Sequence, residues 1–348
     1  MKKRIDYKKS GVDIDKADLA KKRIKSLVRS TFSSSVLTDI GSFGGFYALS
    51  KKKYKNPVLV SSTDSVGTKL KIAFQMNKHD TIGEDIVNHC VNDILVHAAR
   101  PLFFLDYIGI GKLSPSVVEE IVKGLVRGCR KNNCSLIGGE IAELPDLYRP
   151  KEYDLVGFVV GIVERKRIIN GSKIVPGDLL LGLGSNGLHT NGYTLARRVL
   201  FQMGGYKVGD YVKELRNSLG KELLKVHRSY AKPIFRVLER YQIKGMAHIT
   251  GGGIQGNLIR ILPPGCQAEV DLSSWRIPPI FDLIQGVGNV KIEEMYKVFN
   301  MGIGLILVVS KNNVDRIKRE LEKSGEKVYR IGEIIFGKRE VKLINLNR

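Results

Sequence analysis

Residues 58–69 read VLVSSTDSVGTK. The apolar run followed by small polar residues predicts a buried strand that ends in a glycine-containing turn. This strand end carries the carboxylate of Asp64, the hydroxyls of Thr63 and Thr68, and the ammonium group of Lys69. Carboxylate oxygen is a hard ligand for Mg²⁺ and ammonium is a point charge for phosphate, so the stretch suits a magnesium-bound polyphosphate. A strand followed by an exposed polar turn without a ligand has the same pattern. The magnesium-polyphosphate interpretation is favoured because similar carboxylate-bearing polar segments recur further along the chain.

Two further carboxylates stand beside polar or glycine-rich segments. Asp93 follows Asn92 in a helix predicted over residues 82–99, and Glu140 follows a Gly-Gly pair in a short strand that we expect to break into a turn. Three carboxylates that converge from separate segments bind one or two Mg²⁺ ions and leave positions for phosphate oxygens. Each acid alone would be interpreted as a helix cap or a surface group; together with Asp64 they predict a metal site.

Asp106 interrupts an otherwise apolar strand predicted over residues 102–110. Burying an acid is costly unless it is paired or coordinates a metal. We therefore expect its carboxyl group to meet Lys69, Lys112 or a metal ion, unless it lies on an exposed face of the strand.

The second half of the chain carries two polar turns that follow predicted strands. Residues 184–193 read GSNGLHTNGY, which predicts a turn that presents His189 and Asn191 to a ligand. His248 directly precedes a Thr-Gly-Gly-Gly turn at 250–253, whose backbone N–H groups suit an anion at a helix N-terminus. The alternative for His248 is a core histidine beside a structural turn.

Length and composition indicate a two-domain α/β protein. The chain has 348 residues, more than one core usually holds, and its 37 glycines fit many tight turns. The charged, turn-rich segment at 164–178 predicts domains at 1–168 and 169–348. The four cysteines lack zinc-site spacing, no apolar segment follows the charged N-terminus, and the apolar runs are too short to span a bilayer, so we expect a cytoplasmic protein without membrane partners.

The formal net charge of +22 raises the hypothesis of nucleic-acid binding. The lysines are scattered, however, and no helix-turn-helix, zinc finger or RNA-binding motif is visible. We interpret most of the charge as a solvated surface; nucleic-acid binding stays open only as a secondary role.

Hydrophobic periodicity predicts the remaining elements. The expected helices cover 13–28, 117–131, 193–201, 231–241, 254–262, 292–299 and 313–323. The expected strands cover 57–63, 135–140, 154–164, 178–183, 246–249, 304–309 and 327–335.

Eight blocks of the sequence resemble the phosphoribosylformylglycinamidine cyclo-ligase family, also called AIR synthetases. The blocks are YKKSGVDID (7–15), PVLVSSTDSVGTKL (57–70), HDTIGEDIVNHCVNDI (79–94), PLFFLDYIGIGKL (101–113), CSLIGGEIAELP (134–145), GSNGLHTNGYTL (184–195), HITGGG (248–253) and EMYKVFNMGIG (294–304). They occur in order, and several are long enough to be specific. The family converts formylglycinamidine ribonucleotide and ATP into aminoimidazole ribonucleotide, ADP and phosphate in purine biosynthesis.

The resemblance implies an α/β protein of α+β type with two domains. The N-terminal mixed sheets are expected to pair across a homodimer into a barrel-like core, and the C-terminal domains to form α/β layers. ATP with Mg²⁺ is expected near the N-terminal dimer interface, and the small-molecule substrate between the domains.

The matching motifs also imply roles for individual residues. The nucleotide is expected at Lys25, Thr63, Asp64, Gly67, Thr68, Lys69, Asn92, Asp93, Gly138, Gly139 and Glu140, with Asp64, Asp93 and Glu140 as metal ligands. The substrate is expected at His189, Thr190, Asn191, His248, Thr250, Gly251 and Gly252. The expected catalytic groups are His248, His189, Lys69 and Asp106, with either histidine moving the proton.

The chain departs from the family pattern at Ser65 and Ser10, where glycine and alanine are usual. A serine at 65 raises the question whether the turn needs a positive φ there. Other ATP-dependent members of the superfamily, such as thiamine-phosphate kinases, selenophosphate synthetases and a hydrogenase maturation factor, are the alternatives. The glycine-rich N-terminal segments lack the reactive cysteine that the selenium enzyme needs.

Overall fold

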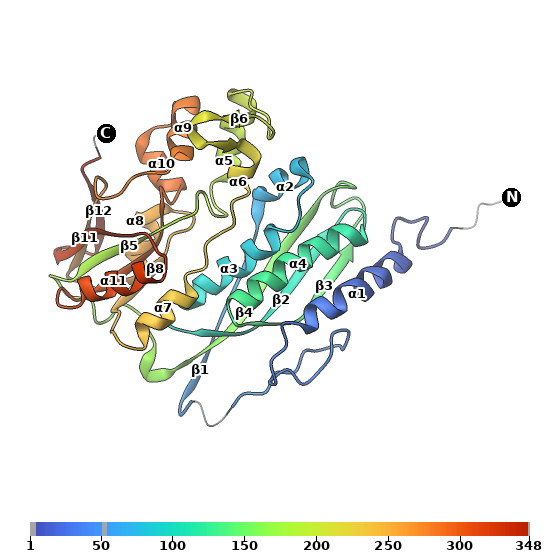
Figure 1. Ribbon diagram of the computed structural model, residues 1–348, viewed down its shortest axis with the longest axis horizontal. Helices are drawn as coiled ribbons and strands as arrows, with labels where there is room; N and C mark the ends of the chain where they lie inside the picture. Colours follow the sequence, from blue (N-terminus) through green and yellow to red (C-terminus); the bar gives the residue numbers. More distant parts are fainter. Residues whose placement is uncertain (1–4, 51–53, 347–348) are drawn as a thin grey trace. The chain divides into compact units, whose positions relative to one another are not determined.

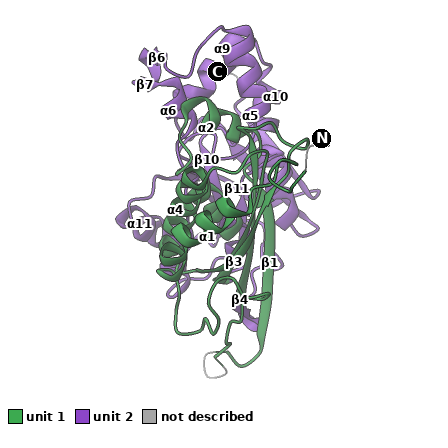
Figure 2. Cartoon of the chain, turned by 90° about the vertical axis from the view of Figure 1, so that its right-hand side faces the viewer, with its two compact units in different colours: residues 1–91, 100–162 green, residues 92–99, 163–348 purple. Residues whose placement is uncertain are grey.

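The computed structural model describes residues 5–50 and 54–346. The chain divides into two compact units, Met1–Val91 with Arg100–Ile162 and Asn92–Ala99 with Val163–Arg348 (Figure 2). The expected boundary at 168/169 lies a few residues beyond this division. The sequence did not indicate that 92–99 groups with the second unit.

The first unit is built on a four-stranded mixed sheet in the order β1-β4-β2-β3. β2 runs parallel to β3 and antiparallel to β4. Helices α1 and α4 cover one face of this sheet (Figures 1 and 2). The elements are α1 (Ile14–Arg29), β1 (Pro57–Ser65), α2 (Leu70–Met76), α3 (Ile82–Leu95), β2 (Arg100–Ile110), α4 (Pro115–Lys131), β3 (Ser135–Glu143) and β4 (Tyr153–Glu164).

Glycines set the close packing of α3 on α4. A Cβ atom at Gly83 would lie 2.2 Å from the carbonyl oxygen of Ile121, and one at Gly124 would lie 2.4 Å from the carbonyl oxygen of Asp80. Contacts below 3 Å to backbone atoms leave no room for a side chain, so the two helices meet backbone to backbone. This brings the buried face of α3 onto the sheet, where a Cβ at Gly157 would meet Ile86 at 2.7 Å.

The second unit contains a six-stranded sheet in the order β12-β9-β11-β5-β10-β8. The central strands β5 and β10 are buried along their whole length, as expected for strands covered on both faces. The strands are β5 (Leu179–Gly184), β8 (Gly245–His248), β9 (Cys266–Asp271), β10 (Ile303–Val309), β11 (Val328–Phe336) and β12 (Glu340–Ile344), with a separate hairpin of β6 (Tyr211–Val212) and β7 (Asn217–Ser218).

The helices of the second unit are short. They are α5 (Tyr193–Arg197), α6 (Leu219–Leu223), α7 (Ala231–Leu238), α8 (Gly253–Leu258), α9 (Pro279–Gly288), α10 (Ile292–Val298) and α11 (Val314–Lys323). α5 continues as a π-helical segment, Arg198–Met203. The two-domain mixed α/β class is confirmed. The elements that were not predicted are α2, β6, β7, α6, β9, α9 and β12.

Several predicted elements differ from the structure, and the helices expected over 231–241 and 254–262 end at Leu238 and Leu258. The helix expected over 82–99 ends at Leu95, where residues 96–99 turn into β2. The Gly138-Gly139 pair does not break its strand: β3 continues through it to Glu143, with Gly139 opposite Asp106 of β2. The neighbouring strand supplies the ladder hydrogen bonds that hold these glycines extended.

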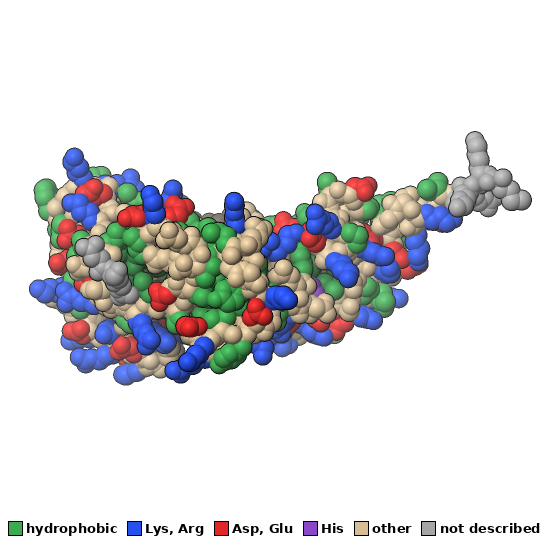
Figure 3. All heavy atoms as spheres, turned by 90° about the horizontal axis from the view of Figure 1, so that it is seen from above, with side chains coloured by type: hydrophobic (Ala, Val, Ile, Leu, Met, Phe, Trp, Pro, Cys, Tyr) green, Lys and Arg blue, Asp and Glu red, His purple; other side chains and the backbone are tan. Residues whose placement is uncertain are grey.

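Basic and acidic side chains alternate over the face drawn in Figure 3. Many lysines also pair with acids, for example Lys71 with Glu152 at 2.7 Å and Lys123 with Glu119 at 2.7 Å. This agrees with the interpretation of the charge as a solvated surface. Among the described residues, no helix is long and apolar enough to cross a membrane.

Candidate active site

Asp64 lies at the end of β1 beside a histidine. Its Oδ2 is 3.0 Å from Nε2 of His89 on α3, and its Oδ1 accepts the backbone N–H of Ser65 at 2.7 Å. The Asp64 side chain is 40% exposed, whereas the His89 side chain is buried. Sequence reasoning missed His89, because helix periodicity does not reveal that this side chain reaches a strand end.

The turn after β1 takes its positive φ from one glycine. Gly67 has φ +66°, and both it and Thr68 are exposed. Ser65 is not among the positive-φ residues, so the serine does not strain the turn. The hydroxyl of Thr63 donates to the carbonyl oxygen of Gly157 at 2.9 Å, and its predicted contact with the nucleotide stays a prediction.

Lys69 is turned inward. Its side chain has no exposed surface, and its Nζ lies 2.8 Å from Oδ1 of Asp85, which is equally buried. Burial lowers the pKa of the Lys69 ammonium, while Asp85 acts in the opposite direction. Of the partners considered for Asp106, Lys69 pairs with Asp85 instead; the predicted contact of Lys69 with phosphate stays a prediction.

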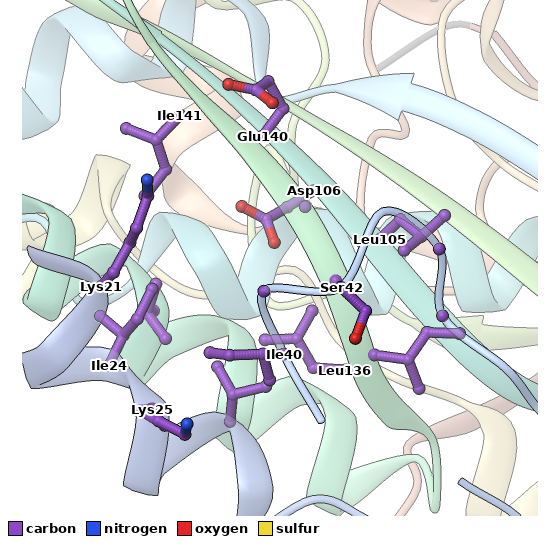
Figure 4. Close-up of a pocket in the computed structure, with 18 of the residues that line it drawn as sticks. Lys21, Ile24, Lys25, Ile40, Ser42, Leu105, Asp106, Leu136, Glu140 and Ile141 are labelled. Atoms are coloured by element: carbon purple, nitrogen blue, oxygen red, sulfur yellow. The ribbon is translucent and has the colours of Figure 1, made fainter. Parts of the chain in front are cut away.

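A cavity of about 690 Å³ lies among α1, the glycine loop at 40–45, and strands β2 and β3 (Figure 4). Its volume is in the range of small-molecule sites. Five residues that the sequence analysis singled out line it, namely Lys25, Asp106, Gly138, Gly139 and Glu140. Aliphatic side chains supply much of the remaining wall.

The lysines of α1 give this cavity a positive rim. Lys21 and Lys25 both line it, and Nζ of Lys25 lies 3.0 Å from Oδ2 of Asp39. Arg29 also binds Asp39, and the hydrogen bonds from these two cations hold the pKa of that carboxyl below its usual range. Lys25 is half exposed, so it is available to a ligand at the rim.

Asp106 lies in the cavity wall. Figure 4 shows its carboxyl group directed into the space between α1 and the glycine loop. Burial raises the pKa of Asp106 from 3.8 to about 7. A Cβ atom at Gly139 would lie 2.5 Å from its Oδ1 and 2.7 Å from its carbonyl oxygen, so the glycine leaves the space that the carboxyl group occupies.

Two of the three predicted metal ligands lie at opposite edges of the first unit's sheet. Asp64 is on β1 and Glu140 on β3, at opposite edges of the four-stranded sheet. Three strand spacings, about 14 Å, separate these backbones, whereas Mg²⁺ binds oxygen at about 2.1 Å. Asp93 belongs to the second unit. Asp64 and Glu140 of one chain are therefore too far apart to share one ion, and the metal-ligand roles of Asp64, Asp93 and Glu140 stay predictions.

Asn92 acts as a backbone clamp. Its amide nitrogen donates to the carbonyl oxygen of Arg228 at 2.8 Å, and its Oδ1 accepts the N–H of Tyr230 at 3.1 Å. The side chain is fully buried. These two hydrogen bonds belong to the fold of the second unit, and the predicted contact of Asn92 with the nucleotide stays a prediction.

The predicted substrate residues of the second unit gather around a hydrogen-bonded chain. Asp93 Oδ1 lies 2.8 Å from Nδ1 of His248, and Nε2 of His248 lies 3.0 Å from Nε2 of His227. Nδ1 of His227 lies 3.2 Å from Oγ1 of Thr190. His227 was not predicted, because nothing in its local sequence, KVHRSY, distinguishes it from a surface histidine.

His189 packs on this chain. Its ring stacks on that of His227 with centroids 4.0 Å apart and 24° between the planes, and its Nε2 accepts the N–H of Asn186 at 3.2 Å. Ligand nitrogens of His189, His227 and His248 lie within 4.8 Å of one another. The three imidazoles therefore form one buried cluster whose nitrogens are close enough to share hydrogen bonds or a metal ion.

The Thr-Gly-Gly-Gly turn is held by Asn257. Its amide nitrogen contacts the carbonyl oxygens of Thr250, Gly251 and Gly253 at 3.3, 3.2 and 2.8 Å. Gly252 has φ +93°, and both it and Gly251 are exposed. A Cβ at Gly251 would lie 3.4 Å from Oδ1 of Asn191, which brings two of the predicted substrate segments together.

Comparison with known proteins identifies two family domains. Residues 50–163 match the model of the AIR synthase related protein, N-terminal domain, and residues 175–344 match that of the C-terminal domain. A phosphoribosylformylglycinamidine cyclo-ligase of Thermodesulfovibrio yellowstonii is 54% identical over 96% of this chain and 97% of that protein. One of Alkaliphilus oremlandii is 50% identical over 97% and 99%.

Solved structures share the fold at low identity. The thiamine-monophosphate kinase of Stenotrophomonas maltophilia superimposes with a TM-score of 0.70 at 18% identity, over 92% of this chain and 96% of that one. A hydrogenase maturation protein in complex with ATP gives 0.63 at 16% identity, over 94% and 89%.

Proposed function

We propose that this chain, which belongs to the AIR synthase related family of phosphoribosylformylglycinamidine cyclo-ligases, closes the imidazole ring of aminoimidazole ribonucleotide. Formylglycinamidine ribonucleotide and ATP are consumed, and ADP and phosphate are released. The observation that carries the proposal is identity of about half the residues to named cyclo-ligases over nearly the whole chain.

The chemistry asks the protein for positioning and charge neutralisation. A formamide oxygen is a poor leaving group, so ATP first phosphorylates it. A nitrogen of the same substrate then attacks that carbon, closes the five-membered ring and expels phosphate. Catalysis of this kind depends on alignment of the reacting groups and on cations near the phosphoryl group.

ATP is proposed to occupy the cavity of the first unit. Its volume, the glycine loop, and the Gly138-Gly139-Glu140 strand support this assignment, and Lys21 and Lys25 at the rim match the charge of a triphosphate. Mg²⁺ would neutralise phosphate charge, with Asp64 and Glu140 as hard oxygen ligands at separate positions. Thr68 and Gly67 remain candidates for phosphate contacts because they are exposed at the turn after β1.

The substrate is proposed to bind the second unit at Thr190, Asn191 and the glycine turn at 250–252. The adjacency of Asn191 and Gly251 supports a common site. The backbone of the turn is fixed by Asn257, which gives a bound anion a rigid partner.

A homodimer and a cytoplasmic location complete the proposal. The face of the first sheet opposite α1 and α4 leaves apolar side chains open, with Leu59 57% and Phe158 37% exposed. Open apolar area on a sheet face is a common interface. Sedimentation of the purified protein as a monomer at micromolar concentration would contradict the homodimer.

The test of the activity is a two-product assay. The protein is mixed with Mg²⁺, ATP and formylglycinamidine ribonucleotide, and ADP and aminoimidazole ribonucleotide are measured together. Equal amounts of both products are expected. ADP without the ring product would point to a different substrate, as in other members of the superfamily, and absence of both products from folded protein would refute the proposed function.

A further inference from the structure

The glycine loop at 40–45 forms one wall of the cavity of the first unit (Figure 4). The chain on both sides of the loop is held together by backbone hydrogen bonds. The N–H of Leu37 donates to the carbonyl oxygen of Phe46 at 2.9 Å, and the N–H of Ala48 donates to that of Ser35 at 2.8 Å. The loop therefore leaves a fixed base and returns to it.

The two ends of the loop are also attached to the elements that form the cavity. Asp39, directly before the loop, binds Lys25 and Arg29 of α1. At the other end, a Cβ atom at Gly45 would lie 2.8 Å from Cδ1 and 3.2 Å from the carbonyl oxygen of Ile137 on β3. The backbone of Gly45 thus lies directly against this strand, and only the tip of the loop is without such an attachment to the cavity walls.

Phe43 lies at this tip. Its side chain is fully exposed, and it is also among the residues that line the cavity. Within the described chain, a Cβ atom at Gly41 or at Gly44 would meet nothing within 4 Å, so the backbone on both sides of Phe43 has open space. A large apolar ring left in water beside an apolar cavity gains free energy when a flat ligand covers it.

The remaining wall of the cavity has an apolar part and a charged part. Ile24, Val28 and Leu136 are buried and line it. Lys21 and Lys25 stand at its rim with exposed side chains. The charges of a triphosphate require cations and water, whereas a nucleobase can be buried among aliphatic groups. We therefore expect a nucleotide to bind with its base among the apolar side chains, next to the loop that carries Phe43.

We propose that the ring of Phe43 stacks on the base of ATP bound in this cavity and so contributes to nucleotide affinity. The inference rests on the proposed function, which assigns ATP to this cavity. Two flat rings in offset contact attract each other beyond the apolar area that they bury. Every base has such a face, so the contact favours a nucleotide over inorganic triphosphate without distinguishing adenine from guanine.

The first experiment measures binding to the full-length protein by calorimetry, with ATP and with inorganic tripolyphosphate, each in the presence of Mg²⁺. We expect Phe43→Ala to raise the Kd for ATP about tenfold and to leave the Kd for tripolyphosphate within about twofold of the wild type. Phe43→Tyr keeps the ring and should stay within about threefold for ATP. Because the Phe43 side chain is exposed, the urea midpoint of Phe43→Ala should equal that of the wild type.

Phe46→Ala is the matched control. Phe46 is a second exposed phenylalanine of the same segment, but it lies outside the set of described residues that line the cavity. Its backbone N–H donates to Oγ1 of Thr38 at 3.0 Å, a hydrogen bond that does not depend on the side chain. We expect this variant to bind ATP and tripolyphosphate with the affinities of the wild type.

A fluorescence measurement reports the stacking directly. The chain has a single tryptophan, Trp275, which is buried in the second unit, so the wild type gives the background emission. We expect ATP to quench most of the emission that Phe43→Trp adds, and tripolyphosphate to leave it unchanged. Added emission that both ligands change equally would refute the stacking.

Three further outcomes would overturn the proposal. They are an equal ATP affinity of Phe43→Ala and Phe46→Ala, a parallel loss of affinity for ATP and tripolyphosphate in Phe43→Ala, and a Phe43→Ala protein that sediments as a monomer where the wild type is a dimer. The last result would assign the ring to an interface between copies of the chain. If the wild-type protein binds ATP but makes no ring product, the proposed function fails, while the calorimetry still decides whether Phe43 contacts the base.

Discussion

Replacing Lys69 by Met tests whether this lysine holds the fold or contacts phosphate. Lys69 and Asp85 have no exposed side-chain surface, and 2.8 Å separates Nζ from Oδ1. Removing one partner leaves a buried carboxylate without its cation, which costs about 3–5 kcal/mol. We therefore expect Lys69→Met to lower the free energy of unfolding by about that amount in urea titrations followed by circular dichroism.

Two companion variants sharpen the result. Lys71→Met, two residues further along the chain, breaks the partly exposed ion pair with Glu152. It should lower the free energy of unfolding by at most about 1 kcal/mol. The double variant Lys69→Met with Asp85→Asn removes both charges and should recover about 2 kcal/mol of the loss, because no buried charge remains.

Kinetics of the double variant then separate the two roles. If Lys69 serves the fold, the double variant keeps its KM for ATP within about threefold. The reasoning is refuted if Lys69→Met is no less stable than Lys71→Met. A stable double variant whose KM for ATP rises more than tenfold would show that Lys69 leaves Asp85 to contact phosphate.

Three further predictions concern named contacts. Asp106→Asn should change the pH dependence of stability. The folded-state pKa of Asp106 is about 7 and lies above 3.8, so the wild-type protein loses stability as pH rises through 7, whereas the variant does not. Between pH 5 and 8 the free energy of unfolding of the variant should rise relative to the wild type by on the order of 2–4 kcal/mol, checked by urea titration at both pH values; the same pH dependence in both proteins would contradict the buried carboxyl group. Gly139→Ala should displace the Asp106 carboxyl group, cost about 1–3 kcal/mol and weaken ATP binding measured by calorimetry. Gly209→Ala is the control, because a Cβ there meets no atom of the described residues within 4 Å and Gly209 is not among the positive-φ glycines. Asn92→Leu should destabilise the second unit by about 2 kcal/mol in the same titrations, because the hydrogen bonds to Arg228 and Tyr230 are lost, and should leave the KM for ATP unchanged. A rise in the KM for ATP without loss of stability would show instead that Asn92 contacts the nucleotide.

The sequence alone determined the chemical class of this protein and most of its elements. A strand running into Asp64 and Gly67, an acid inside an apolar strand at Asp106, and the Gly-Gly-Glu run at 138–140 are local patterns whose physical causes lie within a few residues. The family resemblance, carried by long ordered blocks, gave the fold and activity that the comparisons support.

Only the tertiary structure decided which charged and polar groups meet. Sequence spacing does not show that β4 and β2 separate Asp64 from Glu140, or that Lys69 finds Asp85 inside the core. His227 could be identified only from the structure, where it contacts His248 on β8. A hydrogen bond between residues far apart in the chain leaves no periodic signal in the sequence. The propensity for a helix, strand or turn depends on neighbouring residues. The pairing of buried charges depends on strand order and helix packing, which are determined by the whole chain.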